Sequence, residues 1–106
     1  MLYAAIPKDH WGGLGMEWDK TQSMFSYLNS MRGYMTDAYY QLIFESSMFG
    51  VPPNYRCVLV RWSEIRNPPI GRRREALIES SDPKQVEAVL LMLISIAEEE
   101  KRARGG

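Results

Sequence analysis

Two adjacent prolines, Pro68 and Pro69, constrain the fold of this chain more than any other feature. Proline has no backbone N–H and a fixed φ angle, so a strand does not continue through two of them in a row. Residues 55–65, before the prolines, are rich in β-branched and aromatic side chains, which favours a strand. Residues 73–79, after them, fit a second strand, although the Glu and Ala in this segment suit a helix as well. We therefore predict a β hairpin with antiparallel strands at about 55–65 and 73–79.

A closing helix is predicted after the hairpin. Asp82 suits the N-cap position and Pro83 the first helical position, because proline needs no N–H there. Apolar side chains then recur at intervals of three and four residues, which is the period of one helix face. We predict a helix at about 83–103 whose buried face is formed by Val86, Val89, Leu90, Leu93, Ile94 and Ala97.

The first half of the chain shows a similar pattern. From Met24 to Leu42 the apolar positions are separated alternately by four and three residues, which predicts a long helix or a helix pair at about 19–48. Gly33 lies inside this range, and a helical glycine costs about 0.5–1 kcal/mol relative to alanine, so we expect a bend there. The expected order of helix or helix pair, two strands and helix defines an α+β fold with a small antiparallel sheet.

Length and composition limit the organisation of the protein. With 106 residues, of which 45% are hydrophobic, the chain suits one domain spanning residues 1–106. No apolar run approaches the roughly 18–20 residues of a membrane-spanning helix, and the first residues lack the basic segment that begins a secretory signal. We therefore expect a cytoplasmic protein without a membrane partner.

Catalytic and metal sites are poorly supported by the residue types present. Cys57 is the only cysteine and His10 the only histidine, so the chain has neither an internal disulfide nor the thiolates of a structural zinc site. Cys57 lies between apolar neighbours, which is typical of a packed thiol. No motif combines a nucleophile, a base and an orienting group. We expect a protein that is not an enzyme and that has no cofactor.

Positive charge is concentrated in the predicted hairpin. The whole chain has 13 basic and 13 acidic residues, but six of the basic residues lie between Arg56 and Arg74, where Glu64 is the only acid. Residues 1–55 have three bases and five acids, and residues 75–106 have four bases and seven acids. Loops projecting from a hairpin often carry binding residues. The predicted partner-binding residues are Arg61, Trp62, Arg66, Arg72, Arg73 and Arg74.

The guanidinium groups of this hairpin match the geometry of carboxylates and of phosphates. An acidic protein partner is the leading expectation, and RNA is the alternative. A merely solvated basic turn, with Arg74 paired to Glu64 or Glu75, is a further interpretation. The order of elements also invites comparison with double-stranded-RNA-binding domains, whose closing helix begins with clustered lysines. Here that helix begins with a single Lys84 behind Asp82, which is poor phosphate chemistry.

Homodimer formation is another hypothesis that the sequence leaves open. The stripe from Met24 to Leu42 has the four-and-three spacing of a coiled-coil seam, so two copies of such a helix would pair along it. Packing of the same stripe against the protein's own sheet is the competing use of these residues.

The segment Arg56–Val86 resembles part of a known family. Its sequences RCVL at Arg56–Leu59 and LIES at Leu77–Ser80, followed by Asp82 and the closing helix, are similar to the C-terminal domain of the lyssavirus phosphoprotein, a rhabdovirus polymerase cofactor. The resemblance implies a compact helical unit with a small β hairpin, acting as a viral adaptor that binds the nucleoprotein and host proteins. Residues before Gly50 do not correspond to the family, and no residue's role is carried over from it.

Overall fold

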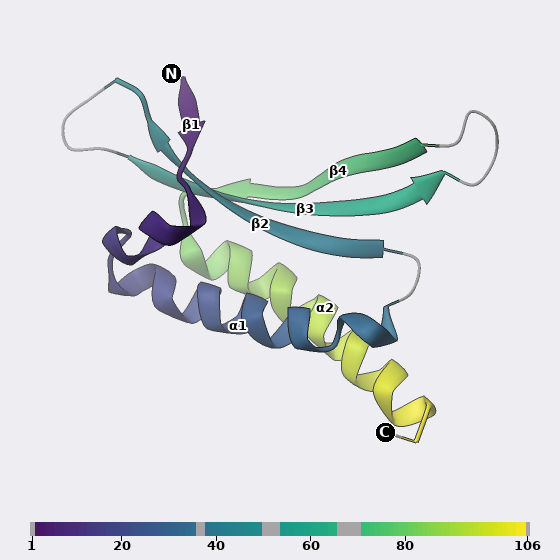
Figure 1. Cartoon of the computed structure of the whole chain (residues 1–106). Coiled ribbons are helices and arrows are strands. Elements are labelled where there is room, and N and C mark those ends of the chain that lie inside the picture. The colour runs from purple at the N-terminus through teal and green to yellow at the C-terminus, as the bar shows by residue number, and fades with distance from the viewer. Residues whose placement is uncertain (1, 36–37, 50–53, 66–70, 106) are drawn as a thin grey trace.

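Four antiparallel strands form a single sheet in the order β1-β2-β3-β4 (Figure 1). The computed structural model describes residues 2–35, 38–49, 54–65 and 71–105. Two α-helices and three short 3-10 helices complete these parts of the chain. The strands are β1 (Tyr3–Ala5), β2 (Ala38–Ser47), β3 (Tyr55–Ile65) and β4 (Gly71–Ser80), and the helices are η1 (Lys8–Gly13), η2 (Met16–Trp18), α1 (Asp19–Ser30), η3 (Arg32–Tyr34) and α2 (Pro83–Ala103).

The α+β class, the hairpin and the closing helix predicted from the sequence are confirmed. Strands β3 and β4 pair antiparallel from Ile65↔Gly71 to Cys57↔Ser80, so the second strand begins two residues earlier than predicted. Helix α2 begins at Pro83, and the side chain of Asp82 accepts a hydrogen bond from the backbone N–H of Lys84 at 3.0 Å. The Pro68–Pro69 turn lies outside the described residues.

The long helix predicted at 19–48 is wrong in its second half. Helix α1 ends at Ser30, η3 follows around Gly33, and residues 38–47 form strand β2. In β2 the side chains of Leu42 and Phe44 are buried in the core, while Ile43 between them is only half-buried and Gln41 before them is exposed, which is the two-residue period of a strand. The four-and-three spacing was satisfied because apolar groups occupy both faces of this strand.

The continuous helix on which the homodimer seam along Met24–Leu42 was placed is not formed by the described residues, and homodimer formation itself stays a prediction. Leu28 and Met31 are 1% and 3% exposed inside the protein's own core. Leu42 lies on a different element and pairs with Leu59 of β3. No continuous helix presents these residues to a second copy.

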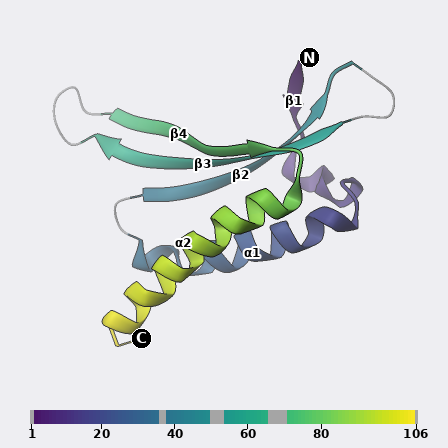
Figure 2. The ribbon, with the colours of Figure 1, turned by 180° about the vertical axis from the view of Figure 1, so that it is seen from behind.

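Both α-helices cover the same face of the sheet, as the two opposite views show (Figures 1 and 2). Phe44 is fully buried between the two layers, and the rings of Trp11 and Trp18 meet it edge-on with centroids at 4.8 and 5.4 Å. Side chains from β2, β3, α1 and α2 complete this core. Its buried members are Leu14, Trp18, Leu28, Met31, Leu42, Phe44, Cys57, Leu59, Val86, Leu90, Ile94 and Ala97.

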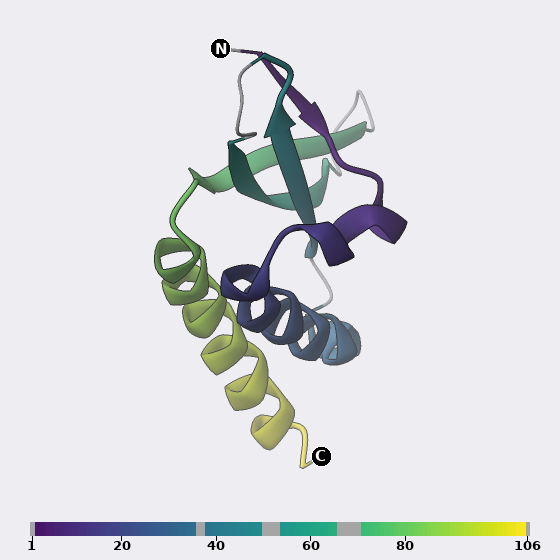
Figure 3. The ribbon, with the colours of Figure 1, turned by 90° about the vertical axis from the view of Figure 1, so that its left-hand side faces the viewer.

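The four-stranded sheet departs from the compact helical unit that the resemblance to the lyssavirus phosphoprotein implies. Strands β2, β3 and β4 are each ten or eleven residues long, and the sheet forms one complete layer of the fold (Figure 3). Among the described residues, no helix is long and apolar enough to cross a membrane.

Candidate functional site

The sheet face opposite the helices carries a distinct set of side chains, which the strand register identifies. Residues paired directly across an antiparallel ladder point to the same face. Tyr39 pairs with Trp62, and Trp62 in turn pairs with Arg74. Their neighbours of opposite parity, such as Leu42 and Leu59, belong to the helix-covered core. Tyr39, Trp62 and Arg74 therefore share the open face, and so does Arg72 through its pairing with Glu64.

Two aromatic rings form the centre of this site. The rings of Tyr39 and Trp62 lie nearly parallel, with an angle of 12° between their planes and 6.3 Å between their centroids. The indole Nε1 of Trp62 donates a hydrogen bond to Oε1 of Gln41 at 3.0 Å, which holds the orientation of the ring. Both aromatic residues are half-buried, so part of each remains accessible.

Arginines surround the aromatic pair. The guanidinium of Arg32, from η3, lies 5.5 Å from the centroid of the Tyr39 ring, a cation–π distance. On the other strand, Nη1 of Arg72 donates to the hydroxyl of Tyr39 at 3.4 Å. Arg74 is the cross-strand neighbour of Trp62. We call Arg32, Tyr39, Trp62, Arg72 and Arg74 the arginine–aromatic patch.

A shallow cavity of about 220 Å³ lies within this patch. Its lining comes from η3, β2, β3 and β4, and Glu64 is the only acidic residue of that lining. Arg72 and Arg74 are exposed, and within the described part of the chain no ion pair involves either of them. Arg32, Arg72 and Arg74 thus outnumber Glu64, the cross-strand neighbour of Arg72, and the patch has a net positive charge.

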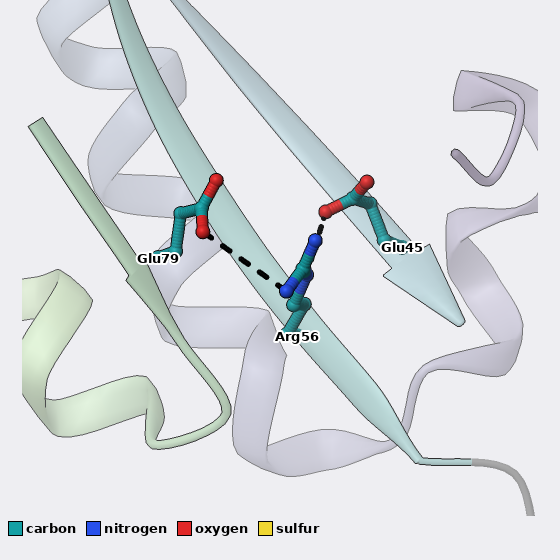
Figure 4. A network of polar contacts seen from close by, with 3 residues as sticks. All are labelled: Glu45, Arg56 and Glu79. Atoms are coloured by element: carbon teal, nitrogen blue, oxygen red, sulfur yellow. Dashed lines mark hydrogen bonds and ion pairs between the residues drawn. The ribbon is translucent and has the colours of Figure 1, made fainter. Parts of the chain in front are cut away.

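Arg56 contrasts with these residues because its charge is already satisfied. Its Nε donates to Oε1 of Glu45 at 2.8 Å, and its Nη1 lies 4.0 Å from Oε2 of Glu79 (Figure 4). The guanidinium also lies 4.0 Å from the centroid of the Tyr3 ring. The hydrogen bond to Glu45 raises the pKa of Arg56, so the group stays charged. This network ties three strands together and offers little charge to a partner.

The structure divides the predicted binding residues between the two faces. Trp62, Arg72 and Arg74 come together in the arginine–aromatic patch. Arg61 points to the helix side, where its Nη1 lies 3.8 Å from Oε2 of Glu75. Arg73 pairs with Ser63, so its side chain points to the same face of the sheet as Arg61 and not to the face of Trp62. Arg66 lies outside the described residues.

Arg32 and Tyr39 are not among the site residues that the sequence predicts, because the sequence pattern places both in a helix, whereas the structure places Tyr39 in strand β2 and Arg32 in η3. The signal that finds Tyr39 is the alternation of Tyr40, Leu42 and Phe44, which places Tyr39 on the other face of a strand. Arg32 has no comparable signal, since its position depends on how η3 brings the chain to the edge of the sheet.

The one cysteine and the one histidine lie in different environments in the described structure. Cys57 is fully buried, and burial raises the pKa of its thiol to about 12, so the nucleophilic thiolate is absent near neutral pH. His10 is exposed on η1, with Nε2 at 3.8 Å from Asp9. Among the described residues no cluster of three His, Cys, Asp or Glu side chains is suited to hold a metal ion.

The beginning of α2 matches the sequence-based interpretation of its chemistry. The carboxylate of Asp82 occupies the cap by accepting from the N–H of Lys84, which places negative charge where a phosphate would otherwise bind. The position that an anion would take at this helix terminus is thus occupied by the protein's own carboxylate.

Comparison of the chain with protein-family models, with curated proteins and with solved structures found no match.

Proposed function

We propose that this protein is a non-enzymatic interaction domain that binds an acidic segment of a protein partner through the arginine–aromatic patch. The observation that carries the proposal is the exposure of Arg72 and Arg74 beside Trp62, with no ion pair to a carboxylate among the described residues, although Glu64 is the cross-strand neighbour of Arg72. A guanidinium can bind a carboxylate through two parallel hydrogen bonds, and such charge-assisted hydrogen bonds are stronger than those between neutral groups.

The aromatic pair supports a protein partner in a different way. Trp, Tyr and Arg are the residues that most often dominate the binding energy of protein interfaces. Tyr39 and Trp62 provide apolar area between the guanidinium groups of Arg32, Arg72 and Arg74. We expect the bound segment to place an apolar side chain on the two rings and its carboxylates on the arginines.

The test compares two neighbouring arginines that the structure places on opposite faces. We expect Arg74→Ala to weaken capture of an acidic partner from the native source, with a loss of about tenfold or more in affinity for the purified partner. Arg73→Ala removes the same charge from the same strand but faces away from Trp62, so its effect should be small. Affinity capture, mass spectrometry and then calorimetry with the purified partner provide the measurements.

Equal losses in the two variants would contradict the proposal, because net charge rather than the patch would then govern binding. Combined Arg72→Ala and Arg74→Ala should abolish capture while leaving the melting temperature nearly unchanged, since both residues are exposed. Unaltered binding in this double variant would end the proposal.

RNA is the second candidate, and the stacked pair of Tyr39 and Trp62 is the observation that favours it. Exposed aromatic rings beside arginines are used by single-strand-binding proteins to stack bases. Titration with single- and double-stranded RNA at two salt concentrations separates the two functions, because phosphate contacts weaken steeply as salt rises. Saturable, salt-sensitive binding that Trp62→Ala abolishes would replace the acidic protein partner with RNA.

A further inference from the structure

A second site lies on the opposite side of the sheet, between the sheet and the second half of helix α2. This helix leaves the sheet at an angle, so its C-terminal turns lie farther from the strands than its first turns do (Figures 1 and 2). Side chains from η3, β2, β3, β4 and α2 enclose a cleft of about 510 Å³ there. That volume falls within the range of about 300–1,000 Å³ that is common for small-molecule sites.

The walls of the cleft are mainly apolar. Leu77 of β4 and Leu93 of α2 are half-buried along it, and Ile96 of α2 is 56% exposed at its side. Leu77 faces the cleft because the register between β3 and β4 shifts after Leu59, which leaves Leu77 without a direct cross-strand partner. An apolar chain entering the cleft would remove these side chains from water, at about 25 cal/mol for each Å² of apolar surface buried.

One end of the cleft is polar. The Nε of Arg61 is buried and, among the described residues, has no hydrogen-bond acceptor. A buried guanidinium N–H without an acceptor is uncommon, because its desolvation is then uncompensated. Tyr40 is the cross-strand partner of Arg61 and also lines the cleft. Burial raises the pKa of Tyr40 and the nearby Arg61 opposes this rise, so the phenol remains a hydrogen-bond donor at neutral pH.

The acid in the cleft lining is already engaged. Oε1 of Glu100 accepts a hydrogen bond from Nε of Arg104 at 3.1 Å. Arg104 also donates to the carbonyl oxygen of Gly33 at 3.3 Å and lies 5.9 Å from the centroid of the Tyr34 ring. This pair closes one rim between α2 and η3. Arg61 is the other cation of the lining; its Nη1 lies 3.8 Å from Oε2 of Glu75, and its Nε lacks an acceptor among the described residues.

We propose that the cleft binds an amphipathic carboxylate, such as a medium-chain fatty acid. The carboxylate accepts hydrogen bonds from the exposed part of the Arg61 guanidinium and from the hydroxyl of Tyr40, and the hydrocarbon chain lies between Leu77, Leu93 and Ile96. The chemistry of the lining favours this ligand, because apolar walls meet the phenol of Tyr40 and the guanidinium of Arg61, whose one ion-pair contact among the described residues is the 3.8 Å approach of Glu75. The site is separate from the arginine–aromatic patch, which lies on the other face of the sheet.

The experiment uses decanoate below its micelle-forming concentration, and decanol as the uncharged probe with the same chain. We expect saturable binding of decanoate by calorimetry, with amide NMR shifts concentrated at the cleft residues, and at least about tenfold weaker binding of decanol. Arg61→Gln should lower the affinity for decanoate to that for decanol. Arg73→Gln, which removes an exposed charge outside the cleft lining, should leave both affinities unchanged.

A second variant separates loss of binding from loss of folding. Ile96 is exposed, so Ile96→Glu should keep the melting temperature while weakening binding of both probes. Absence of saturable decanoate binding, equal affinity of wild type and Arg61→Gln, or shifts outside the cleft would each overturn the proposal. So would light scattering that shows a dimer which Ile96→Glu dissociates, because a second copy would then occupy the cleft.

Discussion

At the scale of single residues, arginine side chains that are close in sequence have very different environments on the two faces of the sheet. Arg56 is held by two carboxylates, Arg61 turns toward the helices, and Arg74 is exposed beside Trp62. Alternation along a strand produces this separation, since consecutive side chains point to opposite faces. Arginines that are close in sequence therefore do not form a single binding surface.

The thiol of Cys57 provides a test of the core at this scale. Its pKa is raised by burial from 9.0 to about 12, so the folded protein keeps the proton that the unfolded chain loses above about pH 9. The contribution of the buried, protonated Cys57 thiol to the unfolding free energy is fully present below the pKa that this thiol has in the unfolded chain, and it is lost as the pH rises toward about 12. We expect the difference in unfolding free energy between wild type and Cys57→Ala to narrow over this range, measured by urea denaturation at several pH values. A constant difference would mean that the thiol ionises equally in both states.

At the scale of elements, α2 depends on a cap that can be removed with little other change. Asp82→Ala deletes the acceptor of the Lys84 N–H and should lower the unfolding free energy by about 1 kcal/mol. Asp82→Asn keeps an acceptor oxygen and should cost much less. Denaturant unfolding followed by circular dichroism measures both variants. Equal losses would assign the effect to the negative charge near the helix start rather than to the cap.

Helix α2 and the β3–β4 hairpin were predictable because several signals agree. For α2 the cap, the proline and the apolar period coincide, and for the hairpin the β-rich runs flank two prolines. The strand at residues 38–47 was not predictable, because its closely spaced Tyr, Leu, Ile and Phe side chains fit both the helical and the strand pattern. Pairing with β3 decides in favour of the strand, and that pairing is a tertiary effect.

The candidate site was also predictable only in part. Trp62, Arg72 and Arg74 were expected to act together and are placed on one face. The alternation in β3 already separates Arg61 from Trp62, but grouping by sequence distance joined them. The parity of Arg73 depends on the register shift after Leu59, which no local pattern reveals. Tyr39 required the correct assignment of β2.

At the scale of the whole molecule, the sheet separates two proposed sites, and they should act independently. Changes at distant positions without shared contacts usually add to within about 0.5 kcal/mol. We expect Arg72→Ala with Arg74→Ala to leave decanoate binding unchanged, and Ile96→Glu to leave capture of the acidic partner unchanged. Titrating each ligand against each variant and against their combination tests this expectation. A combined effect larger than the sum would show coupling through the sheet.

Strand β4 is the last strand in the sheet order, so its outer side has no neighbouring strand among the described elements. Exposed strand borders tend to pair with other chains and to start aggregates, and long charged side chains there act as gatekeepers against such pairing. Arg72, Arg73 and Arg74 occupy this position near the beginning of β4. Arg72 and Arg74, which we propose to bind a negatively charged partner, thus also stand where charge disfavours pairing of β4 with a strand of another chain.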